Sequence, residues 1–196
     1  MKKKIILFGS GGHAASCADV IESTKKYTIC GFISEDKKLG KNFLNYPVLS
    51  GINDTEKIFK ITKNLIIAFG SIYDCKKRSK IFNSLRKKGF MFHTIVSPNA
   101  YVSKNSKIGT GTIVMHGSVI NSGVEIDENC IINSNSLIEH DCKLSSNCHV
   151  STSATLNGGV VVGRDSFIGS RSVIKEGAIL KNNTFIKMGQ IVKKNL

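Results

Sequence analysis

The chain has 196 residues, of which 41% are hydrophobic, so it can fold around a core and does not have the composition of a disordered protein. No apolar run approaches the roughly 20 residues of a membrane span. The run Ile5–Phe8 is also too short for a signal peptide, which needs about 7–15 apolar residues. We therefore expect a cytoplasmic protein without membrane insertion.

The formal net charge of +14 suggests an anionic partner. The basic residues are mostly scattered lysines, and the sequence has no Trp and little mixing of aromatic with basic side chains, which disfavours nucleic acid. Nucleotide sugars and coenzyme A are polyanions that suit the same charge. A lysine-rich proteome would give the same balance with no function attached to it.

The six cysteines form no C-x-x-C pair, which argues against zinc-ribbon and thioredoxin-type sites. Cys130, Cys142 and Cys148 stand at the same position of a six-residue repeat described below. We therefore interpret them as small core residues and expect no disulfide framework.

Residues 1–97 alternate short apolar stretches with helix-like stretches. This alternation predicts a Rossmann-like α/β domain with a small parallel sheet. The expected strands are Ile5–Phe8, Ile29–Ile33, Leu65–Phe69 and Phe90–Val96, and the expected helices are Ala14–Lys25, Asn53–Lys60 and Asp74–Lys88. Tyr46–Leu49, which contains a proline, is expected to be a loop.

Residues 98–196 follow a different pattern, in which an aliphatic residue recurs every six residues. It occupies 16 consecutive positions from Val102 to Val192, and a small residue stands two positions before each of them from Ala100 to Thr184. A period of six fits neither an amphipathic helix nor an ordinary strand. It predicts a left-handed parallel β-helix of hexapeptide repeats, in which three short strands make one triangular coil and the aliphatic residues stack inside.

Four segments resemble one family of enzymes. They are Ile5–Ala14 (IILFGSGGHA), Gly31–Asp36 (GFISED), Ile66–Gly70 (IIAFG) and Asn133–Cys142 (NSNSLIEHDC). With the hexapeptide repeats they resemble the left-handed β-helix sugar acetyltransferases, in the group of sialic-acid O-acetyltransferases and PglD-like UDP-amino-sugar N-acetyltransferases. The resemblance implies a homotrimer with active sites between adjacent helices, a first domain that binds a nucleotide sugar and a β-helix that binds acetyl-CoA. The family's closing Gly-x-Pro-Ala-Lys motif is missing from the tail Met188–Leu196.

His140 is the predicted general base. An amine or hydroxyl acceptor must lose a proton when it attacks a thioester, and imidazole suits that task near neutral pH. Either Glu139 or Asp141 could orient the ring, and the resemblance favours Asp141 as the second catalytic residue. From the residues alone, His140 could also be a solvated surface histidine.

The resemblance assigns His149 and Gly158 to acetyl-CoA. His149 would approach the acetyl group, and the Gly158 N–H would stabilise the oxyanion of the reacting thioester, for which glycine allows close approach. An exposed strand residue and a turn glycine are the structural alternatives for these two positions. The pairwise spacing of the histidines, with no pair one coil apart, argues against a β-helix zinc site, so no metal is expected.

The loop Gly9, Ser10, Gly11, Gly12 and His13 follows a predicted strand and precedes a predicted helix. It satisfies G-x-G-x-x-A, which brings backbone close to a phosphate at a helix N-terminus. We expect it to bind the diphosphate of a UDP-type sugar, with Glu35 or Asp36 near the base or ribose. An NAD site would need a fuller sheet, and a tight turn without ligand is the structural alternative.

These observations favour an acetyl-CoA-dependent N-acetyltransferase that acts on a UDP-linked amino sugar for surface glycan synthesis. One alternative is an O-acetyltransferase for sialic acid or a polysaccharide precursor. Another is a non-catalytic trimeric scaffold that binds nucleotide sugars.

Overall fold

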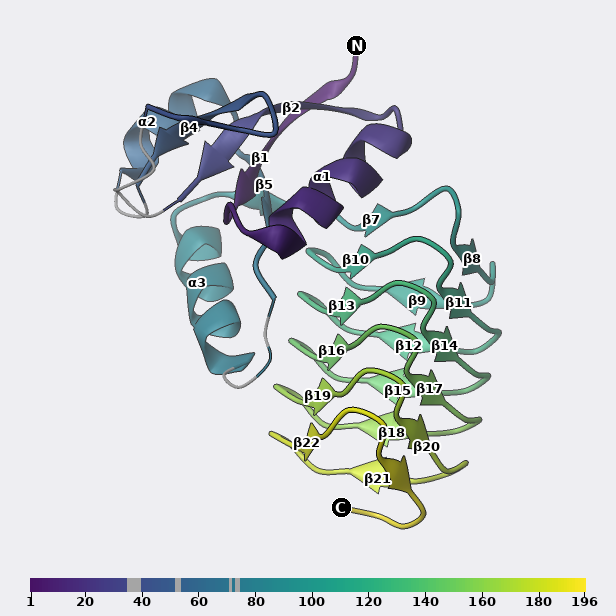
Figure 1. The fold of residues 1–196 in the computed structure, drawn as a ribbon. Helices are drawn as coiled ribbons and strands as arrows, with labels where there is room; N and C mark the ends of the chain where they lie inside the picture. Colours follow the sequence, from purple (N-terminus) through teal and green to yellow (C-terminus); the bar gives the residue numbers. More distant parts are fainter. Residues whose placement is uncertain (35–39, 52–53, 71, 73–74) are drawn as a thin grey trace. The chain divides into compact units, whose positions relative to one another are not determined.

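A computed structural model describes residues 1–34, 40–51, 54–70, 72 and 75–196. The chain forms two compact units (Figure 1). The first comprises Met1–Gly70 and Ile81–His93, and the second comprises Thr94–Leu196 together with the first residues of the helix Cys75–Lys87. None of the helices in the described ranges combines the length and apolarity that a transmembrane span requires.

The first unit is built on one sheet with the strand order β3-β4-β2-β1-β5-β6, in which every pair is parallel except β3–β4. This confirms the predicted small parallel sheet. The strands are β1 (Lys3–Phe8), β2 (Tyr27–Ile33), β3 (Asn42–Phe43), β4 (Tyr46–Ser50), β5 (Asn64–Ile67) and β6 (Met91–Phe92). The helices are α1 (Gly12–Ser23), α2 (Thr55–Ile61) and α3 (Cys75–Lys87).

The core of this unit forms around β1. Ile5, Ile6 and Leu7 are fully buried in β1, which pairs with β2 on one edge and with β5 on the other. A continuous apolar run is what a central parallel strand needs, since both of its faces are covered. Helix α1 buries Ala14, Cys17, Ala18 and Ile21, which are spaced for one helical face.

Two sequence-based expectations were wrong. Tyr46–Leu49 is not a loop but most of β4, which pairs with β2 and β3; the sheet accommodates Pro47 in the two-residue antiparallel pairing with β3. Phe90–Val96 is not one strand. It divides into β6, which joins the first sheet, and β7 (Ile95–Val96), which pairs with β10 of the second unit.

The second unit is a left-handed parallel β-helix of two-residue strands, as predicted (Figure 1). It starts at β7, before the residue at which the sequence placed the second domain. Its strands are β7 (Ile95–Val96), β8 (Tyr101–Val102), β9 (Lys107–Ile108), β10 (Ile113–Val114), β11 (Val119–Ile120), β12 (Glu125–Ile126), β13 (Ile131–Ile132), β14 (Leu137–Ile138), β15 (Lys143–Leu144), β16 (His149–Val150), β17 (Thr155–Leu156), β18 (Val161–Val162), β19 (Phe167–Ile168), β20 (Val173–Ile174), β21 (Ile179–Leu180), β22 (Phe185–Ile186) and β23 (Ile191–Val192).

Every third strand belongs to the same sheet, so the β-helix has three flat faces. The strand orders are β22-β19-β16-β13-β10-β7, β23-β20-β17-β14-β11-β8 and β21-β18-β15-β12-β9. Ile138 pairs with Leu156, and Leu144 pairs with Val162, so one coil takes 18 residues. A residue therefore lies next to the residues 18 positions before and after it.

The second residue of each strand points inward. From Val114 to Val192, each of these aliphatic residues is at most 3% exposed. The small residues two positions earlier are buried as well from Thr112 to Ala178, including Cys130, Cys142 and Cys148. This confirms both parts of the hexapeptide pattern, and it explains the three cysteines as core residues.

From Gly111 onward, each corner of the β-helix contains a residue in the left-handed conformation. Positive φ angles recur every six residues from Gly111 to Gly189, mostly at glycine or asparagine. Arg171, with φ +56°, is one of the exceptions. A left-handed L-residue other than Gly, Asn or Asp raises the energy of the fold, so Arg171 occupies an unfavourable position.

Arg171→Gly is therefore expected to raise the free energy of unfolding by about 0.5 kcal/mol or more, because relief of about 1–2 kcal/mol outweighs the added chain entropy of glycine. Arg164 is the matched control. It is also an exposed corner arginine but has no positive φ, so Arg164→Gly should lower stability by about 0.5–1 kcal/mol. Urea unfolding at one protein concentration checks both, and equal losses for the two variants would contradict the prediction.

Candidate active site

The candidate site is a corner of the β-helix between β14 and β15. His140 and Asp141 form this corner, and Asp141 is its left-handed residue, with φ +60°. The backbone N–H of Asp141 donates to the carbonyl of Ser122 at 3.0 Å, which ties the corner to the coil before it. Aspartate is one of the few residues that tolerate this conformation. The same side chain can therefore occupy the left-handed corner position and contact the imidazole of His140.

Asp141 orients the ring of His140. Its Oδ2 lies 2.9 Å from Nδ1 of His140. A carboxylate can only accept, so Nδ1 carries the hydrogen and Nε2 of the neutral ring keeps its lone pair. The side chains of His140 and Asp141 are 66% and 72% exposed, so a substrate can reach this corner from solvent.

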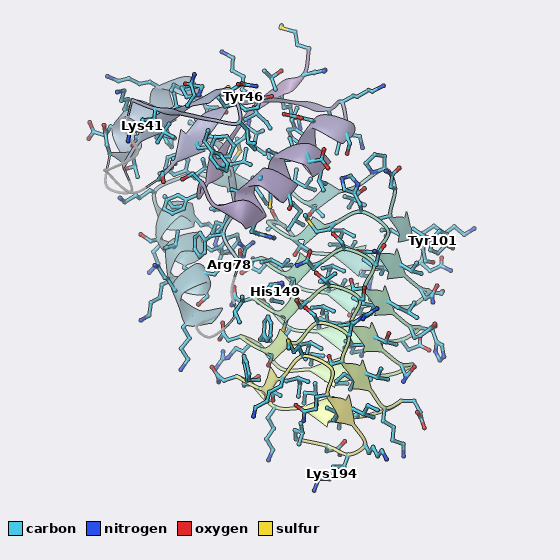
Figure 2. The ribbon with its side chains drawn as sticks, viewed as in Figure 1. Lys41, Tyr46, Arg78, Tyr101, His149 and Lys194 are labelled. Carbon is cyan, nitrogen blue, oxygen red and sulfur yellow. The ribbon has the colours of Figure 1, made fainter. Side chains whose placement is uncertain are left out.

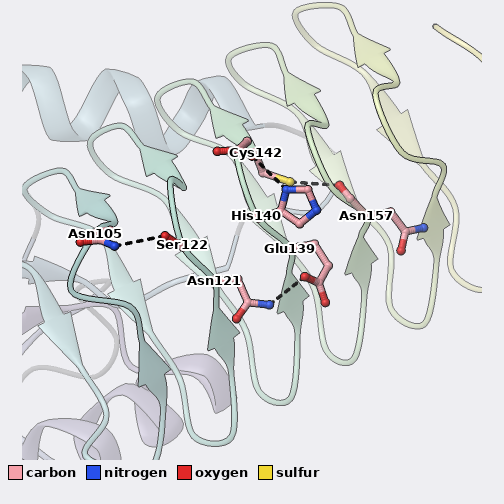
Figure 3. A network of polar contacts seen from close by, with 8 residues as sticks. Asn105, Asn121, Ser122, Glu139, His140, Cys142 and Asn157 are labelled. Carbon is pink, nitrogen blue, oxygen red and sulfur yellow. Dashed lines mark hydrogen bonds and ion pairs between the residues drawn. The ribbon is translucent and has the colours of Figure 1, made fainter.

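The two carboxylates that the sequence offered as partners of His140 have different partners in the structure. Glu139 accepts a hydrogen bond from Nδ2 of Asn121 at 2.8 Å, and this bond fixes it away from the ring (Figure 3). Of Glu139 and Asp141, only Asp141 is hydrogen-bonded to the His140 side chain. The geometry therefore agrees with the choice of Asp141.

Gly158 lies directly beside the ring of His140. The two residues are 18 positions apart, so they occupy the same corner on successive coils, and the N–H of Gly159 donates to the carbonyl of His140 at 2.8 Å. A Cβ atom on Gly158 would stand only 2.6 Å from Nε2 of His140. Any larger residue at position 158 would therefore clash with the imidazole, and glycine provides the room that the ring needs.

The backbone N–H of Gly158 has no hydrogen-bond partner among the described residues, whereas its carbonyl accepts from Gly177 at 2.9 Å. An unused backbone N–H on the glycine that packs against the His140 ring can serve as an oxyanion donor. The structure therefore brings together three of the predicted residues: His140, Asp141 and Gly158.

Sequence reasoning overlooked the contacts of Cys142 with this corner. Its Sγ donates to the carbonyl of Asn157 at 3.1 Å, and the Asn157 amide donates to the carbonyl of Ile174 at 2.9 Å (Figure 3). Burial raises the pKa of the Cys142 thiol to about 11. The signal for these contacts in the sequence is a separation of about one coil, which links Cys142 with Asn157 and His140 with Gly158.

His149 does not join this group within one chain. It lies on β16 (Figure 2), which belongs to a different face of the β-helix from β14. Its side chain is buried, with 4% exposed. Its ring packs edge-on against Phe167, with the centroids 5.1 Å apart, and Nε2 lies 3.4 Å from Nδ2 of Asn133. The predicted coenzyme contact of His149 stays a prediction.

In the first unit, the predicted phosphate loop connects β1 to α1. Gly9 has φ +124°, and a Cβ there would come within 3.0 Å of the Ala68 carbonyl oxygen, so this position requires glycine. Gly11 and Gly12 face open space and stand at the start of α1. A ligand could therefore approach their backbone closely, and the predicted contact with a diphosphate stays a prediction.

The remaining loop residues are placed as follows. Ser10 is buried, and its Oγ lies 2.5 Å from Oγ of Ser34 at the end of β2. His13 lies in the first turn of α1. Glu35 and Asp36 come directly after Ser34 but lie outside the described residues, so their predicted contact with the base or ribose stays a prediction.

The other histidines have partners of their own. Nδ1 of His116 lies 2.6 Å from Oγ of Ser97, and Nε2 of His93 lies 2.8 Å from Oδ1 of Asn64. Burial, with a smaller effect from Lys3, lowers the pKa of His93. Within the described ranges, no three His, Cys, Asp or Glu side chains are grouped as a metal site would need.

Comparisons with known proteins agree with this division of the chain. The family model described as PglD N-terminal domain matches residues 4–85, and the model of six bacterial transferase hexapeptide repeats matches residues 105–140. No curated protein matches the chain.

The solved structures that are similar over nearly the whole chain include the following three. A histidine-to-asparagine variant of perosamine N-acetyltransferase from Caulobacter crescentus, in complex with CoA and GDP-perosamine, is 26% identical with a TM-score of 0.90, over 98% of this chain and 90% of that one. The acetyltransferase domain of PglB from Neisseria gonorrhoeae FA1090 is 21% identical with a TM-score of 0.88, over 100% and 93%. WeeI from Acinetobacter baumannii AYE is 20% identical with a TM-score of 0.73, over 97% and 96%.

The two matched family models, the β-helix with its His140 corner and the likeness to perosamine N-acetyltransferase lead to one conclusion. This chain is an acyltransferase, and in both matched domains and in its fold it resembles the left-handed β-helix, hexapeptide-repeat sugar acetyltransferases.

Proposed function

We propose that the protein transfers the acetyl group of acetyl-CoA to the amine of a nucleotide-linked amino sugar, in the synthesis of a surface glycan. The observation that carries the proposal is the His140 corner, where an imidazole oriented by Asp141 stands next to the unused N–H of Gly158. A base beside an oxyanion donor is what acyl transfer from a thioester requires.

The reaction divides between these groups. The lone pair of the amine attacks the thioester carbonyl carbon, and Nε2 of His140 takes the proton that the nitrogen loses. The Gly158 N–H stabilises the negative charge that forms on the carbonyl oxygen. When the carbon–sulfur bond breaks, the coenzyme A thiolate leaves and His140 returns the proton to it, so the enzyme ends as it began.

Asp141 has a supporting part in this scheme. Its contact of 2.9 Å with Nδ1 keeps Nε2 as the proton acceptor and stabilises the imidazolium that forms during attack. His149 was assigned to the acetyl group as well, but its burial against Phe167 leaves little of its ring accessible in a single chain. The proposal therefore depends on His140, Asp141 and Gly158.

The Gly9–His13 loop would hold the acceptor's diphosphate. The open backbone at Gly11 and Gly12 lies at the N-terminus of the 12-residue helix α1, where the helix dipole favours negative charge. The sequence suggested a UDP-linked sugar, whereas the similar perosamine N-acetyltransferase is described with GDP-perosamine. Both nucleotides belong in the test.

We further propose that the protein acts as a homotrimer. The His140 and Asp141 side chains are open to solvent in a single chain, as expected for a site that a neighbouring subunit completes. Light scattering is expected to give three times the chain mass of 21.3 kDa. A stable monomer at micromolar concentration would contradict this assembly.

The function is tested by release of the coenzyme A thiol from acetyl-CoA in the presence of UDP- and GDP-linked amino sugars. With the true acceptor, His140→Ala should lower kcat by about 100-fold or more, since general-base catalysis contributes roughly 10²–10⁴-fold. Asp141→Asn should lower kcat by a smaller factor than His140→Ala. His116→Ala is the matched control, because His116 stands at the same repeat position but beside Ser97, and it should leave kcat unchanged.

Two outcomes would contradict the proposal. Near-wild-type turnover of His140→Ala would remove the base from the mechanism. Acetylation of free sialic acid, with no turnover of any nucleotide-linked amine, would make the protein an O-acetyltransferase instead.

The acceptor site is tested by Gly11→Val. A Cβ on Gly11 meets no atom within 4 Å, so the larger side chain should extend into the open space without disturbing the fold. It should therefore block the diphosphate and weaken nucleotide-sugar binding by about tenfold or more, roughly 1.4 kcal/mol, while acetyl-CoA binding is unchanged. Calorimetric titration of each ligand decides: unchanged nucleotide-sugar binding would move the acceptor away from this loop.

A further inference from the structure

A buried thiol lies behind the proposed oxyanion donor. Cys142 follows His140 by two residues, is fully buried, and donates from Sγ to the carbonyl oxygen of Asn157 at 3.1 Å. That carbonyl belongs to the Asn157–Gly158 peptide group. The N–H of the same peptide group is the unused donor beside Nε2 of His140.

The sulfur holds this turn through its bond to the Asn157 carbonyl oxygen. Hydroxyl groups at the same repeat position make the same contact with the next coil elsewhere. Oγ1 of Thr112, for example, donates to the Asp127 carbonyl at 2.9 Å and accepts from the Cys130 N–H at 3.0 Å. The arrangement is thus a regular means by which one coil fixes the corner of the next.

At this corner, the contact has a consequence for chemistry. A peptide group is planar and trans, so its C=O and N–H point in opposite directions. A bond that fixes the Asn157 oxygen on the inner side therefore fixes the direction of the Gly158 N–H on the outer side. The raised pKa, about 11, keeps the Cys142 thiol protonated and able to donate throughout the neutral range.

We propose that Cys142 is a positioning residue for acetyl transfer, because its thiol holds the Asn157–Gly158 peptide group with the Gly158 N–H directed at the reacting carbonyl. The inference rests on the proposed function for the identity of the reaction. It assigns Cys142 no contact with substrate. Its part is to reduce the motion of a donor that works only when it is fixed in advance.

The test compares Cys142→Ala with Cys142→Ser. Alanine removes the donor and is tolerated by the fold, since Ala154 and Ala178 are buried at the same repeat position. Serine keeps a donor. Cys148 is the matched control, because its Sγ makes the equivalent bond to the Gly163 carbonyl, at 3.2 Å, in a corner without His140.

Cys142→Ala should lower kcat about tenfold, part of the roughly 10²–10³-fold that loss of a whole oxyanion donor costs, with the KM for acetyl-CoA changed less than about twofold. Cys142→Ser should recover most of that loss, and Cys148→Ala should leave kcat within about twofold of wild type. The amide NMR signal of Gly158, assigned by its loss in Gly158→Ala, should move in Cys142→Ala and stay in place in Cys148→Ala.

Equal kcat losses in Cys142→Ala and Cys148→Ala would show a general effect of thiol removal on the fold, and would overturn the positioning role. Unchanged kcat in Cys142→Ala would overturn it as well. If the wild-type protein transferred acetyl to no acceptor, the proposed function would fail, yet the Gly158 amide signal would still decide whether the thiol fixes this peptide group.

Discussion

The structure depends on the hydrogen bonds between successive coils of the β-helix, which fix a register of 18 residues. Each corner is bonded to the corner before it, as Asp141 is to Ser122 and Gly159 is to His140. These bonds decide which side chains meet. His140 faces Gly158 because the two are one coil apart, and a shift of one residue between the coils would replace that glycine by a neighbour.

The residues that turn the chain at a corner of the β-helix can also form part of the proposed active site. A left-handed residue turns the chain, and a small buried residue behind it bonds the backbone of the next coil. At most corners these features only stabilise the coil. At the β14–β15 corner the left-handed residue is Asp141, which also orients His140, and the small residue is Cys142, which also holds the peptide group of Gly158. The proposed site thus adds little to the standard corner except the imidazole.

Much of the fold could be predicted because its periodicities are strong. The six-residue pattern gave the β-helix and its inward residues, since each repeat meets the same physical requirement. The errors arose where local sequence does not specify pairing. Pro47 suggested a loop, but β4 is held by its neighbours β2 and β3. The apolar run Phe90–Val96 does not show that it serves two sheets, although Val96 stands six residues before Val102.

The candidate site was only partly visible in the sequence. Resemblance and the nature of imidazole pointed to His140, but a choice between Glu139 and Asp141 needs side-chain geometry, which the bond between Asn121 and Glu139 supplies. Cys142 looked like an ordinary core residue, because its bond to Asn157 joins positions far apart in the sequence. Patterns of neighbouring residues in the sequence therefore do not reveal the contacts between successive coils.

The most direct test of the account is a crystal structure with a non-reactive acetyl-CoA analogue and the nucleotide-linked amino sugar. We expect the carbonyl oxygen of the analogue to lie about 2.7–3.1 Å from the Gly158 nitrogen. We also expect the sugar nitrogen to lie within about 3.2 Å of Nε2 of His140. A thioester bound at another corner of the β-helix, away from His140 and Gly158, would contradict it.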